Sequence, residues 1–537
     1  MTQTSESEAP PAESAVTPLA EPHLQAVLAS AGLDAEYVAA WGNTLLRREA
    51  DGREHPVVDY AGGYGSLLLG HHHPELTAYA RQLLADRVPV HAQFSVHPEA
   101  DRLARALNRV IGRELGTDEP YFAIFASTGA EAIEAALKHA EMDRVMRLRT
   151  LTEDLAAGLA EARAAVGAGR ANVPDAVRHR VAAPGALPGG PQELFDRVEA
   201  HNAAVAARPP VFLAPEGSFH GKLVGSVQLT HNEGYRLPFR SLAAQARFVP
   251  TDQPGALRKI VDEESAVLYG LEVADGEVRL TEHPAPLFGA FVLEPIQGEG
   301  GIRELPAAFA AEVREVCAEA DCPVVVDEIQ SGMGRTGDFL ASRRLGLRGD
   351  YYTLAKSLGG GLAKISVLLV RGSRYRGEFE LVHSSTFAKD AYSSLIALKV
   401  LELIEADSGA VYRTAARLGE RLLAMLEAIR ADYPDVVKDV RGRGLMLGME
   451  FHEQSRAADP AVGQAARAGL FGYLVAGHLL TAHSIRTFPT ASAPETLRFE
   501  PSVLLTDAEI DQLETALRDV CDIVRGQYRR PLALPAG

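Results

Sequence analysis

Cysteine is scarce in this sequence, with three residues among 537. Their positions, Cys317, Cys322 and Cys521, match neither a disulfide framework nor the paired spacing of a zinc site. Because disulfides persist only in oxidising compartments, this composition favours a reducing one. We therefore expect a cytoplasmic protein.

The sequence also lacks an excess of basic residues and any long apolar run. It has 54 basic against 71 acidic residues, a formal net charge of -17, which argues against a nucleic-acid-binding surface. No apolar run is long enough to cross a bilayer, so no membrane partner is expected. The opening residues have neither the basic start nor the apolar core of a signal peptide, and we expect residues 1–22 to form a disordered leader.

Two nucleotide-binding motifs are missing as well. A P-loop needs GxxxxGK followed by Ser or Thr, but at the Gly221–Lys222 pair Leu223 follows and Glu216 replaces the first glycine. No GxGxxG segment lies between a predicted strand and a helix early in a βαβ unit. These absences argue against nucleotide chemistry.

Short apolar runs alternate with helical periodicity between about residues 120 and 400. Each run ends at a polar or small residue, as in YFAIFAS, PPVFLAPE, GAFVLEP, CPVVVDE and DYYTLAK. This alternation predicts an α/β domain with a mostly parallel sheet flanked by helices. Amphipathic stretches around a predicted strand, GLMLGMEF, indicate a smaller α+β domain at the carboxyl end.

Residues 141–208 interrupt this rhythm. They are rich in Ala and Arg, with helical patches around a PGALPGGPQ loop, and we interpret them as a helical insertion. The insertion is either surface decoration or a lid or partner surface, and the sequence leaves its role open.

The segment FASTGAEAIEAALKHA, residues 125–140, predicts a strand, a tight turn and a helix. A helix start has unpaired backbone N–H groups and a positive dipole end, so an anion such as phosphate fits at Gly129 and Ala130. The competing interpretation is that Ser127 or Thr128 is an ordinary N-cap.

Two charged side chains follow predicted strands elsewhere. Asp327 ends VVVDE, and Lys356 ends DYYTLAK before a run of glycines that lets the backbone pass close to a flat or bulky group. Lysine is rarely buried unless it is paired or reactive. Pyridoxal 5'-phosphate (PLP) needs such an amine, a carboxylate for its pyridinium proton, an aromatic face and phosphate donors. The chain supplies each part.

The order of eight motifs resembles the class III aminotransferases, which include the acetylornithine, ornithine and 4-aminobutyrate aminotransferases. The resemblance runs from about residue 40 to about residue 525 and rests on STGAEAIEAALKHA, SFHGKLVGSVQLT, EPIQGEGG, VVVDEIQSGMGRTG, TLAKSLGGGLA, HSSTFAKDAYSSLIALKVL, VRGRGLMLGMEF and TLRFEPSVLLT. It implies PLP fold type I, with residues 23–95 joining the small domain, residues 96–400 forming the large PLP-binding domain and residues 401–537 forming the carboxyl-terminal part of the small domain.

The resemblance also implies catalytic roles. Lys356 resembles the lysine that forms the internal aldimine (a Schiff base) and moves the proton during transfer. Asp327 resembles the partner of the pyridine nitrogen, whose negative charge keeps that nitrogen protonated. Glu328 is expected to be structural.

Further residues match cofactor-binding positions of the family. By this resemblance, Ile329 would pack under the ring, Gln330 would hydrogen-bond its 3′-oxygen, and Phe219 resembles the aromatic residue that stacks on the ring, with His220 beside it. For Phe219 the alternative is core packing, and for His220 it is a structural hydrogen bond. The phosphate cup and the floor of the site match Thr128, Gly129, Ala130 and Glu294.

Three more residues concern substrate and assembly. Glu299 resembles a glutamate that pairs with an arginine and gates the substrate carboxylate, and Arg498 matches that arginine; a structural salt bridge is the alternative for Arg498. Thr386 matches a threonine that reaches the phosphate of the neighbouring subunit, which implies a homodimer with shared active sites. His71, His72 and His73 belong to a His-Pro turn of the family, and we expect no metal.

The expected activity is transfer of an amino group from an amino acid or ω-amine to a 2-oxo acid or aldehyde. The same fold also supports aminomutase, epimerase and decarboxylase reactions, and a non-catalytic binding protein can retain it. Ala130, Lys222 and the segment TFAKD depart from common family residues, so the sequence does not identify the donor or the acceptor.

Overall fold

The computed structural model describes residues 19–90, 95–181 and 189–532. Residues 1–18 of the expected leader and residues 182–188 of the expected insertion therefore lie outside the described residues. Within the described ranges, no helix combines the length and the apolar character needed to cross a membrane.

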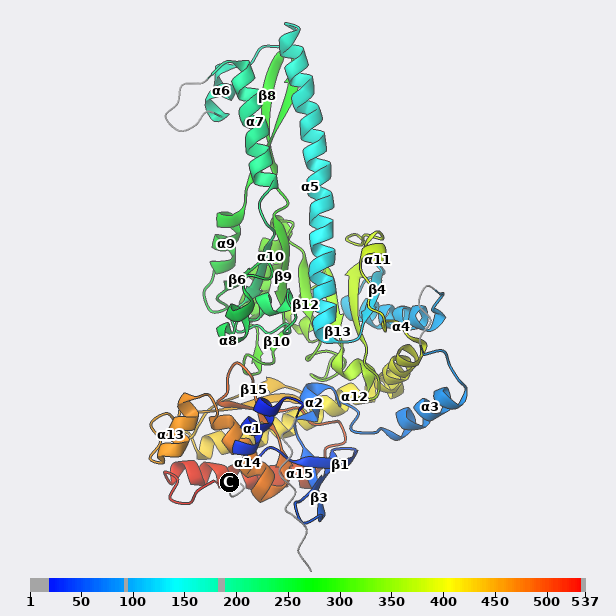
Figure 1. Ribbon diagram of the computed structural model, residues 1–537, viewed down its shortest axis with the longest axis vertical. Helices are drawn as coiled ribbons and strands as arrows, with labels where there is room; N and C mark the ends of the chain where they lie inside the picture. The colour runs from blue at the N-terminus through cyan, green and yellow to red at the C-terminus, as the bar shows by residue number, and fades with distance from the viewer. Residues whose placement is uncertain (1–18, 91–94, 182–188, 533–537) are drawn as a thin grey trace, which may run out of the picture.

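A seven-stranded sheet forms the centre of the molecule (Figure 1). Its strands lie in the order β4-β14-β13-β12-β9-β5-β6, and only β14 runs antiparallel to its neighbours. The bounds are β4 Tyr121–Ala126, β5 Val211–Pro215, β6 Ala246–Val249, β9 Phe288–Leu293, β12 Val324–Asp327, β13 Tyr351–Leu354 and β14 Ser366–Arg371. The five predicted strands are confirmed, whereas β6 and β14 were not predicted.

The three consecutive valines of β12 are explained by burial on both faces of this sheet. Val325 packs in a cluster with the helix that follows β4, while Val324 and Val326 pack in the main core on the opposite face. Because alternate residues of a strand point to opposite faces, a strand covered on both sides needs apolar residues throughout. The first polar residue of β12, Asp327, therefore stands at the carboxyl end of the strand, at the edge of the sheet.

Helices cover both faces of the sheet and also occur in the arm and in the smaller domain (Figure 1). Their bounds are α1 Pro22–Ser30, α2 Gly62–Gly65, α3 Pro74–Ala85, α4 Pro98–Leu115, α5 Gly129–Gly167, α6 Asp175–Val181, α7 Pro191–Ala206, α8 Glu233–Arg236, α9 Ala256–Glu264, α10 Ala307–Glu319, α11 Phe379–Val382, α12 Ala391–Asp432, α13 Pro460–Arg467, α14 Phe471–His483 and α15 Asp507–Arg525. The backbone of α12 leaves helical geometry at residues 406–409.

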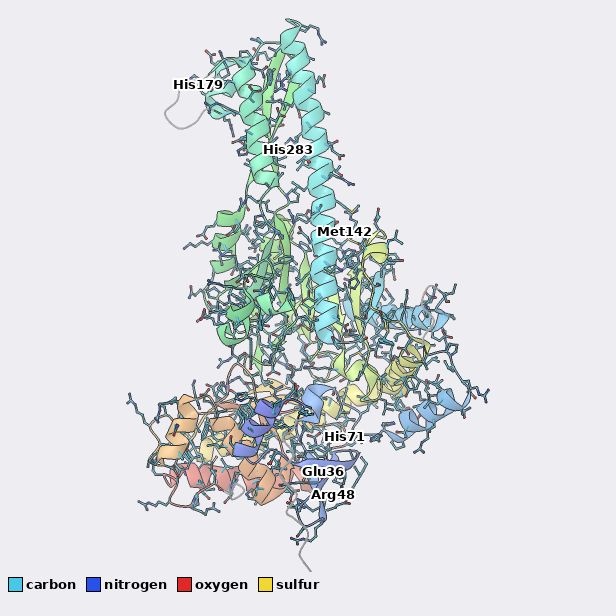
Figure 2. The ribbon with its side chains drawn as sticks, in the orientation of Figure 1. Glu36, Arg48, His71, Met142, His179 and His283 are labelled. Atoms are coloured by element: carbon cyan, nitrogen blue, oxygen red, sulfur yellow. The ribbon has the colours of Figure 1, made fainter. Side chains whose placement is uncertain are left out.

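An arm extends from the sheet, built on α5 (Figure 1). The lower part of α5 packs on the sheet, while its upper part continues with α6, α7 and a hairpin of β7 Val267–Ala274 and β8 Glu277–Pro284. Figure 2 shows Met142 at the base of the arm and His283 and His179 further out. The arm has its own apolar cluster, which includes Leu159, Phe195 and Leu271. The hairpin was not predicted.

The two ends of the chain meet in a smaller domain with two sheets. One has the order β1-β2-β3-β17, in which Ile485 of β17 pairs in parallel with Val58 of β3. The other is antiparallel, with the order β15-β16-β19-β18, and β16 is the predicted GLMLGMEF strand. The bounds are β1 Glu36–Trp41, β2 Thr44–Arg48, β3 Glu54–Asp59, β15 Val437–Arg443, β16 Met446–Phe451, β17 Ile485–Arg486, β18 Phe488–Pro489 and β19 Thr496–Phe499.

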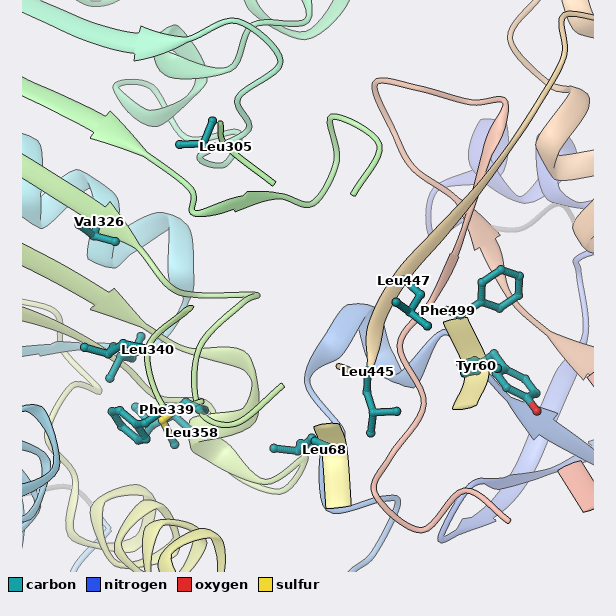
Figure 3. Packing of buried hydrophobic residues seen from close by; sticks show 14 of the residues in the cluster. Tyr60, Leu68, Leu305, Val326, Phe339, Leu340, Leu358, Leu445, Leu447 and Phe499 are labelled. Atoms are coloured by element: carbon teal, nitrogen blue, oxygen red, sulfur yellow. The ribbon is translucent and has the colours of Figure 1, made fainter. Parts of the chain in front are cut away.

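One continuous apolar core joins the large sheet to this smaller domain. Figure 3 shows Val326 and Leu358 on the large-domain side and Leu447 and Phe499 on the other, all in the same cluster. Fully buried Arg335 lies between them and donates hydrogen bonds to the carbonyl oxygens of Leu445, Pro501 and Gly65. The α/β fold with a mostly parallel sheet and a smaller domain made by both chain ends is confirmed.

Candidate active site

A cavity of about 400 Å³ lies at the carboxyl ends of the central strands. This is the volume of a small-ligand pocket, in the position where parallel sheets bind ligands. The predicted site residues that line it are Thr128, Gly129, Ala130, Phe219, His220, Glu294, Glu299, Asp327, Ile329, Gln330 and Lys356.

Lys356 lies directly after β13 in a backbone conformation that is unusual for lysine. Its φ of 46° is in the left-handed region, where a non-glycine residue is strained, and such strain clusters at functional sites. Burial lowers the pKa of Lys356, and nearby carboxylates offset this only in part. Its amine can therefore be neutral more readily than that of an exposed lysine, which suits a nucleophile or base.

Asp327 ends β12 and points into the same cavity, where it is 5% exposed. His220 Nδ1–H donates to Asp327 Oδ2 over 2.8 Å, and the backbone N–H of Ile329 donates to Oδ1 over 3.1 Å. Burial alone would lower the pKa of His220, but the hydrogen bond to Asp327 and its charge outweigh burial and raise that pKa. Within the described residues His220 Nε2 has no hydrogen-bond partner, so the dyad has one buried polar atom left for a ligand.

Glu328 faces away from the cavity. Its two carboxylate oxygens accept hydrogen bonds from Ser331 Oγ at 2.6 Å and from the backbone N–H of Ser342 at 2.8 Å. The neighbouring carboxylates thus point to opposite sides of the strand end. Asp327 lines the cavity, whereas Glu328 holds the loop segments that contain Ser331 and Ser342 in place.

The start of α5 lines another side of the cavity. Thr128 is its N-cap, and it forms a reciprocal capping box with Glu131. The N-cap interpretation therefore holds for the Thr128 side chain, while the backbone N–H groups of Gly129 and Ala130, in the first turn, have no partner within the helix. A Cβ on Gly129 would lie 2.9 Å from Ile329, so only glycine allows this close approach.

Glu294 supports the floor of the cavity through the backbone. Its carboxylate accepts hydrogen bonds from the N–H groups of Phe219 at 2.9 Å and Gly298 at 3.0 Å. Burial raises the pKa of Glu294 to about 7, and the negative charge of Asp327 acts in the same direction, whereas His220 acts against it. The position of Phe219 beside the cavity thus depends on Glu294.

Arg498 is 1% exposed and pairs with Glu299 at the edge of the cavity. The two side chains meet as a fork, with Nη1 to Oε1 at 2.8 Å and Nη2 to Oε2 at 2.5 Å. Burial acts to raise the pKa of Glu299, but the charge and hydrogen bonds of Arg498 lower it to about 2. The Arg498 guanidinium also lies over the Tyr64 ring, 4.9 Å from its centre.

Two predicted positions lie elsewhere. Thr386 is exposed and does not line the cavity of its own chain. In the His-Pro turn, His71 Nε2 is 2.9 Å from Asp59 Oδ2, and Arg486 binds the other oxygen of that carboxylate, Oδ1, so His71 belongs to a polar network around Asp59.

A group that could ligate a metal is formed by other residues. His478 and His483 each place Nε2 3.0 Å from Asp519 Oδ2 in the described part of the chain. Arg530 also donates to Asp519, so a positive charge already occupies the carboxylate.

Several residues of the site were missed by sequence reasoning. Ser66 and Lys364 line the cavity, Tyr64 contacts Arg498, and Glu500 accepts a hydrogen bond from Gln330. Glu500 stands two residues after Arg498 in TLRFEPS, and a second charge in so apolar a strand was a usable signal. Tyr64 had only the surrounding glycines of GGYG to mark it.

Comparisons with known proteins agree with this geometry. A family model described as aminotransferase class-III matches residues 33–520. A putrescine aminotransferase from Pectobacterium atrosepticum is 29% identical over 459 residues, which cover 84% of this chain and 78% of that protein. Aminotransferase PigE from a Serratia species is 27% identical over 512 residues, which cover 88% of this chain but only 49% of that protein.

Solved structures show the same fold. An ornithine aminotransferase from Toxoplasma gondii superposes with a TM-score of 0.63 at 21% identity, and 92% of each chain is covered. A PLP-bound amine transaminase from an uncultivated Pseudomonas species gives 0.64 at 21% identity, covering 97% of this chain and all of that one.

Proposed function

This chain belongs to the class III aminotransferases, PLP-dependent enzymes of fold type I, and from this premise we propose how its residues perform the transfer. The observation that carries the proposal is that the strained Lys356, the Asp327–His220 dyad and the start of α5 share one cavity. Lys356 would hold the cofactor through its amine, Asp327 would face the ring nitrogen, and the N–H groups of Gly129 and Ala130 would bind the phosphate.

The residues present fit the cofactor. Bound PLP supplies an electron-poor ring that accepts the electron pair released at the substrate carbon. The Asp327 carboxylate provides negative charge at a buried position, and His220 holds that carboxylate in place. Phe219, with its backbone held by Glu294, and Ile329 both line the cavity and would pack against the two faces of a flat ring.

Lys356 is also the proposed base of the reaction. Burial keeps its pKa below that of an exposed lysine, so the amine Nζ can accept a proton from the substrate carbon at neutral pH and return it at the next step. No hydrogen bond or ion pair holds Lys356 Nζ among the described residues, which leaves it free to move between these positions.

The Arg498–Glu299 fork determines which donors enter. An amine without a carboxylate leaves the fork closed, whereas an amino acid donor must displace Glu299 from Arg498 and take its place. The relative named putrescine aminotransferase favours the first class. We propose that the donor is an ω-amine or an amino acid and the acceptor a 2-oxo acid or aldehyde.

A screen of amines and amino acids against 2-oxo acids and aldehydes, with product identification, tests this proposal. Formation of the donor's carbonyl product, an aldehyde from an ω-amine or a 2-oxo acid from an amino acid, together with the aminated acceptor in equal amounts supports transfer. Carbon dioxide release without transfer, or a rearranged amino acid as the main product, would favour decarboxylation or isomerisation on the same fold.

We further propose a homodimer with shared active sites in the cytoplasm. Thr386 is exposed in its own chain, and the nearby Leu381 and Val382 are 89% and 65% exposed, a patch that suits a protein interface. A surface hollow of about 1240 Å³ runs along α4 and includes Phe122 but none of the predicted site residues. Its lining also includes Glu380 and Lys389, which flank this exposed patch in the sequence. Sedimentation velocity over a dilution series tests it, since a monomer that retains full activity contradicts a shared site.

The division of the chain is proposed in the same terms, with a leader over residues 1–22, a large domain over 96–400 and a small domain formed by 23–95 and 401–537. The insertion over 141–208 has no proposed role in the reaction, because none of its described residues lines the cavity and most of it lies in the arm. Its deletion together with the β7–β8 hairpin should leave the transfer intact.

A further inference from the structure

Glu500 is a fully buried carboxylate where the two chain ends and the large sheet meet. It follows β19, its backbone N–H donates to the Tyr60 carbonyl at 2.7 Å, and its Oε1 accepts a hydrogen bond from Gln330 Nε2 at 2.7 Å. Its Oε2 lies 3.6 Å from Arg498 Nη1 and accepts no hydrogen bond from the residues that the structure describes.

This bonding differs from that of a structural carboxylate. Glu328, also fully buried, has both oxygens satisfied by Ser331 and Ser342. A buried carboxylate oxygen that accepts no hydrogen bond lowers the stability of the folded state, so its presence calls for a functional explanation. The Glu500 oxygen that accepts no hydrogen bond is the one that forms the 3.6 Å ion pair with Arg498, which belongs to the active site.

Three cations lie in the field of this single carboxylate. Arg498 is the nearest, at 3.6 Å. Arg335 is the second: burial lowers its pKa to about 10, and the negative charge of Glu500 opposes that decrease. Burial lowers the pKa of Lys356 as well; among the charged groups facing it, Glu500 opposes that shift most, followed by Glu299 and Asp327, while Arg498 adds to it.

The contact with Gln330 fixes the direction of an amide that lines the cavity. Because a carboxylate can only accept, the amide must turn its nitrogen toward Glu500, and its oxygen then lies against Gly298. A Cβ on Gly298 would lie only 1.9 Å from that oxygen, so the fit depends on glycine.

We propose that Glu500 is a positioning and specificity residue, whose carboxylate orients the Gln330 amide with one oxygen and with the other places a negative charge between Arg498 and Lys356. This inference rests on the proposed roles of Lys356 and Arg498. The added charge weakens the attraction of Arg498 for a donor carboxylate and favours donors that carry a second ammonium group instead.

The test is Glu500→Gln, which keeps the shape and removes the charge, with Asp143→Asn as the control. Asp143 is a buried carboxylate paired with Arg147, Arg374 and Arg376, away from the cavity. In the holoenzyme the ratio of kcat/KM for 4-aminobutyrate to that for putrescine should rise about tenfold in Glu500→Gln and stay unchanged in the control.

A second readout needs no turnover. In the apoenzyme, the pH midpoint for acylation of Lys356, followed by peptide mass spectrometry, should fall by about one unit in Glu500→Gln, because a group that favours the ammonium form is gone. If that variant does not fold, Glu500→Asp moves the carboxylate away from Arg498 and Lys356 by one methylene length. The donor ratio and the acylation midpoint should then shift in the same directions as in Glu500→Gln, but by less.

An unchanged midpoint together with an unchanged donor ratio would overturn the role of Glu500, as would a uniform loss for both donors. Failure of the proposed function has a different signature, since the cofactor would then remain covalently attached in Lys356→Ala. The two outcomes are therefore distinguishable.

Discussion

Replacement of Arg498 by alanine is the sharpest test of how this site admits donors. In the structure the guanidinium makes two parallel bonds to Glu299, at 2.8 Å and 2.5 Å, at the edge of the cavity. A donor carboxylate that replaces Glu299 would form the same fork. Arg498→Ala removes this fork for an amino acid donor but removes no direct contact to a simple amine.

The expected magnitude follows from the number and type of bonds lost. A bidentate charge-assisted pair is worth roughly 2–4 kcal/mol, or about 30-fold to 1,000-fold in kcat/KM. The decrease in kcat/KM for an amine donor without a carboxylate should be far smaller. Glu299 is 12% exposed and keeps the backbone hydrogen bond from Ala491 at 2.7 Å when Arg498 is gone, so it is not left without a partner.

The assay compares kcat/KM for glutamate with that for an amine lacking a carboxylate, in wild type, Arg498→Ala and the control Arg144→Ala. Arg144 is also buried and forms a fork with the more exposed Glu141, at 2.6 Å and 2.7 Å, on α5 outside the cavity. The control reports the general cost of removing such a pair. Equal losses for both donors in Arg498→Ala would mark Arg498 as structural.

Three further predictions concern the cofactor side of the site. Lys356→Ala should abolish turnover, and borohydride reduction followed by mass spectrometry should label wild type and the exposed-lysine control Lys259→Ala but not Lys356→Ala; a label in that variant would assign attachment to another residue. Asp327→Asn should raise the cofactor Kd roughly 10-fold to 150-fold, because a hydrogen bond to a charged group is worth about 1.5–3 kcal/mol, and an unchanged Kd by equilibrium dialysis would contradict its role. Burial raises the pKa of Glu294 from 4.5 to about 7, so the folded apoenzyme favours the protonated form, and the unfolding free energy should decrease from about pH 5 to pH 8 by on the order of 3 kcal/mol. Urea unfolding of Glu294→Gln should lack this part of the pH dependence, and an identical slope would show that Glu294 does not titrate there.

The arm built on α5 shows a limit of local sequence patterns. Helical character over residues 141–208 was readable from composition, but the hairpin that packs beside it, Val267–Ala274 with Glu277–Pro284, comes some sixty residues later. Strand propensity depends on which neighbours cover a strand, and here the cover comes from α5 and α7. Periodicity in one segment cannot report such a partner.

The sequence by itself determined the central strands and the residues that end them. VVVDE and DYYTLAK are apolar because both faces of the sheet are covered, and the first polar residue beyond each strand must lie at the open edge. Asp327 and Lys356 were therefore predictable from local pattern, and parallel pairing of β12 with β13 brings them to the same cavity.

Only the tertiary structure decided that Glu500 joins the charges of the site, whereas the family resemblance had already implied the Arg498–Glu299 pair. Gln330 and Glu500 are 170 residues apart in the chain, yet they are in hydrogen-bond contact, and Glu500 also lies 3.6 Å from Arg498. Local spacing places a side chain on a face of its element, but it does not determine which distant charge shares its cavity. Burial and neighbouring charge act on a pKa only over a few ångströms, so the lowered pKa of Lys356 and the position of Glu500 follow from how the chain ends pack against the sheet.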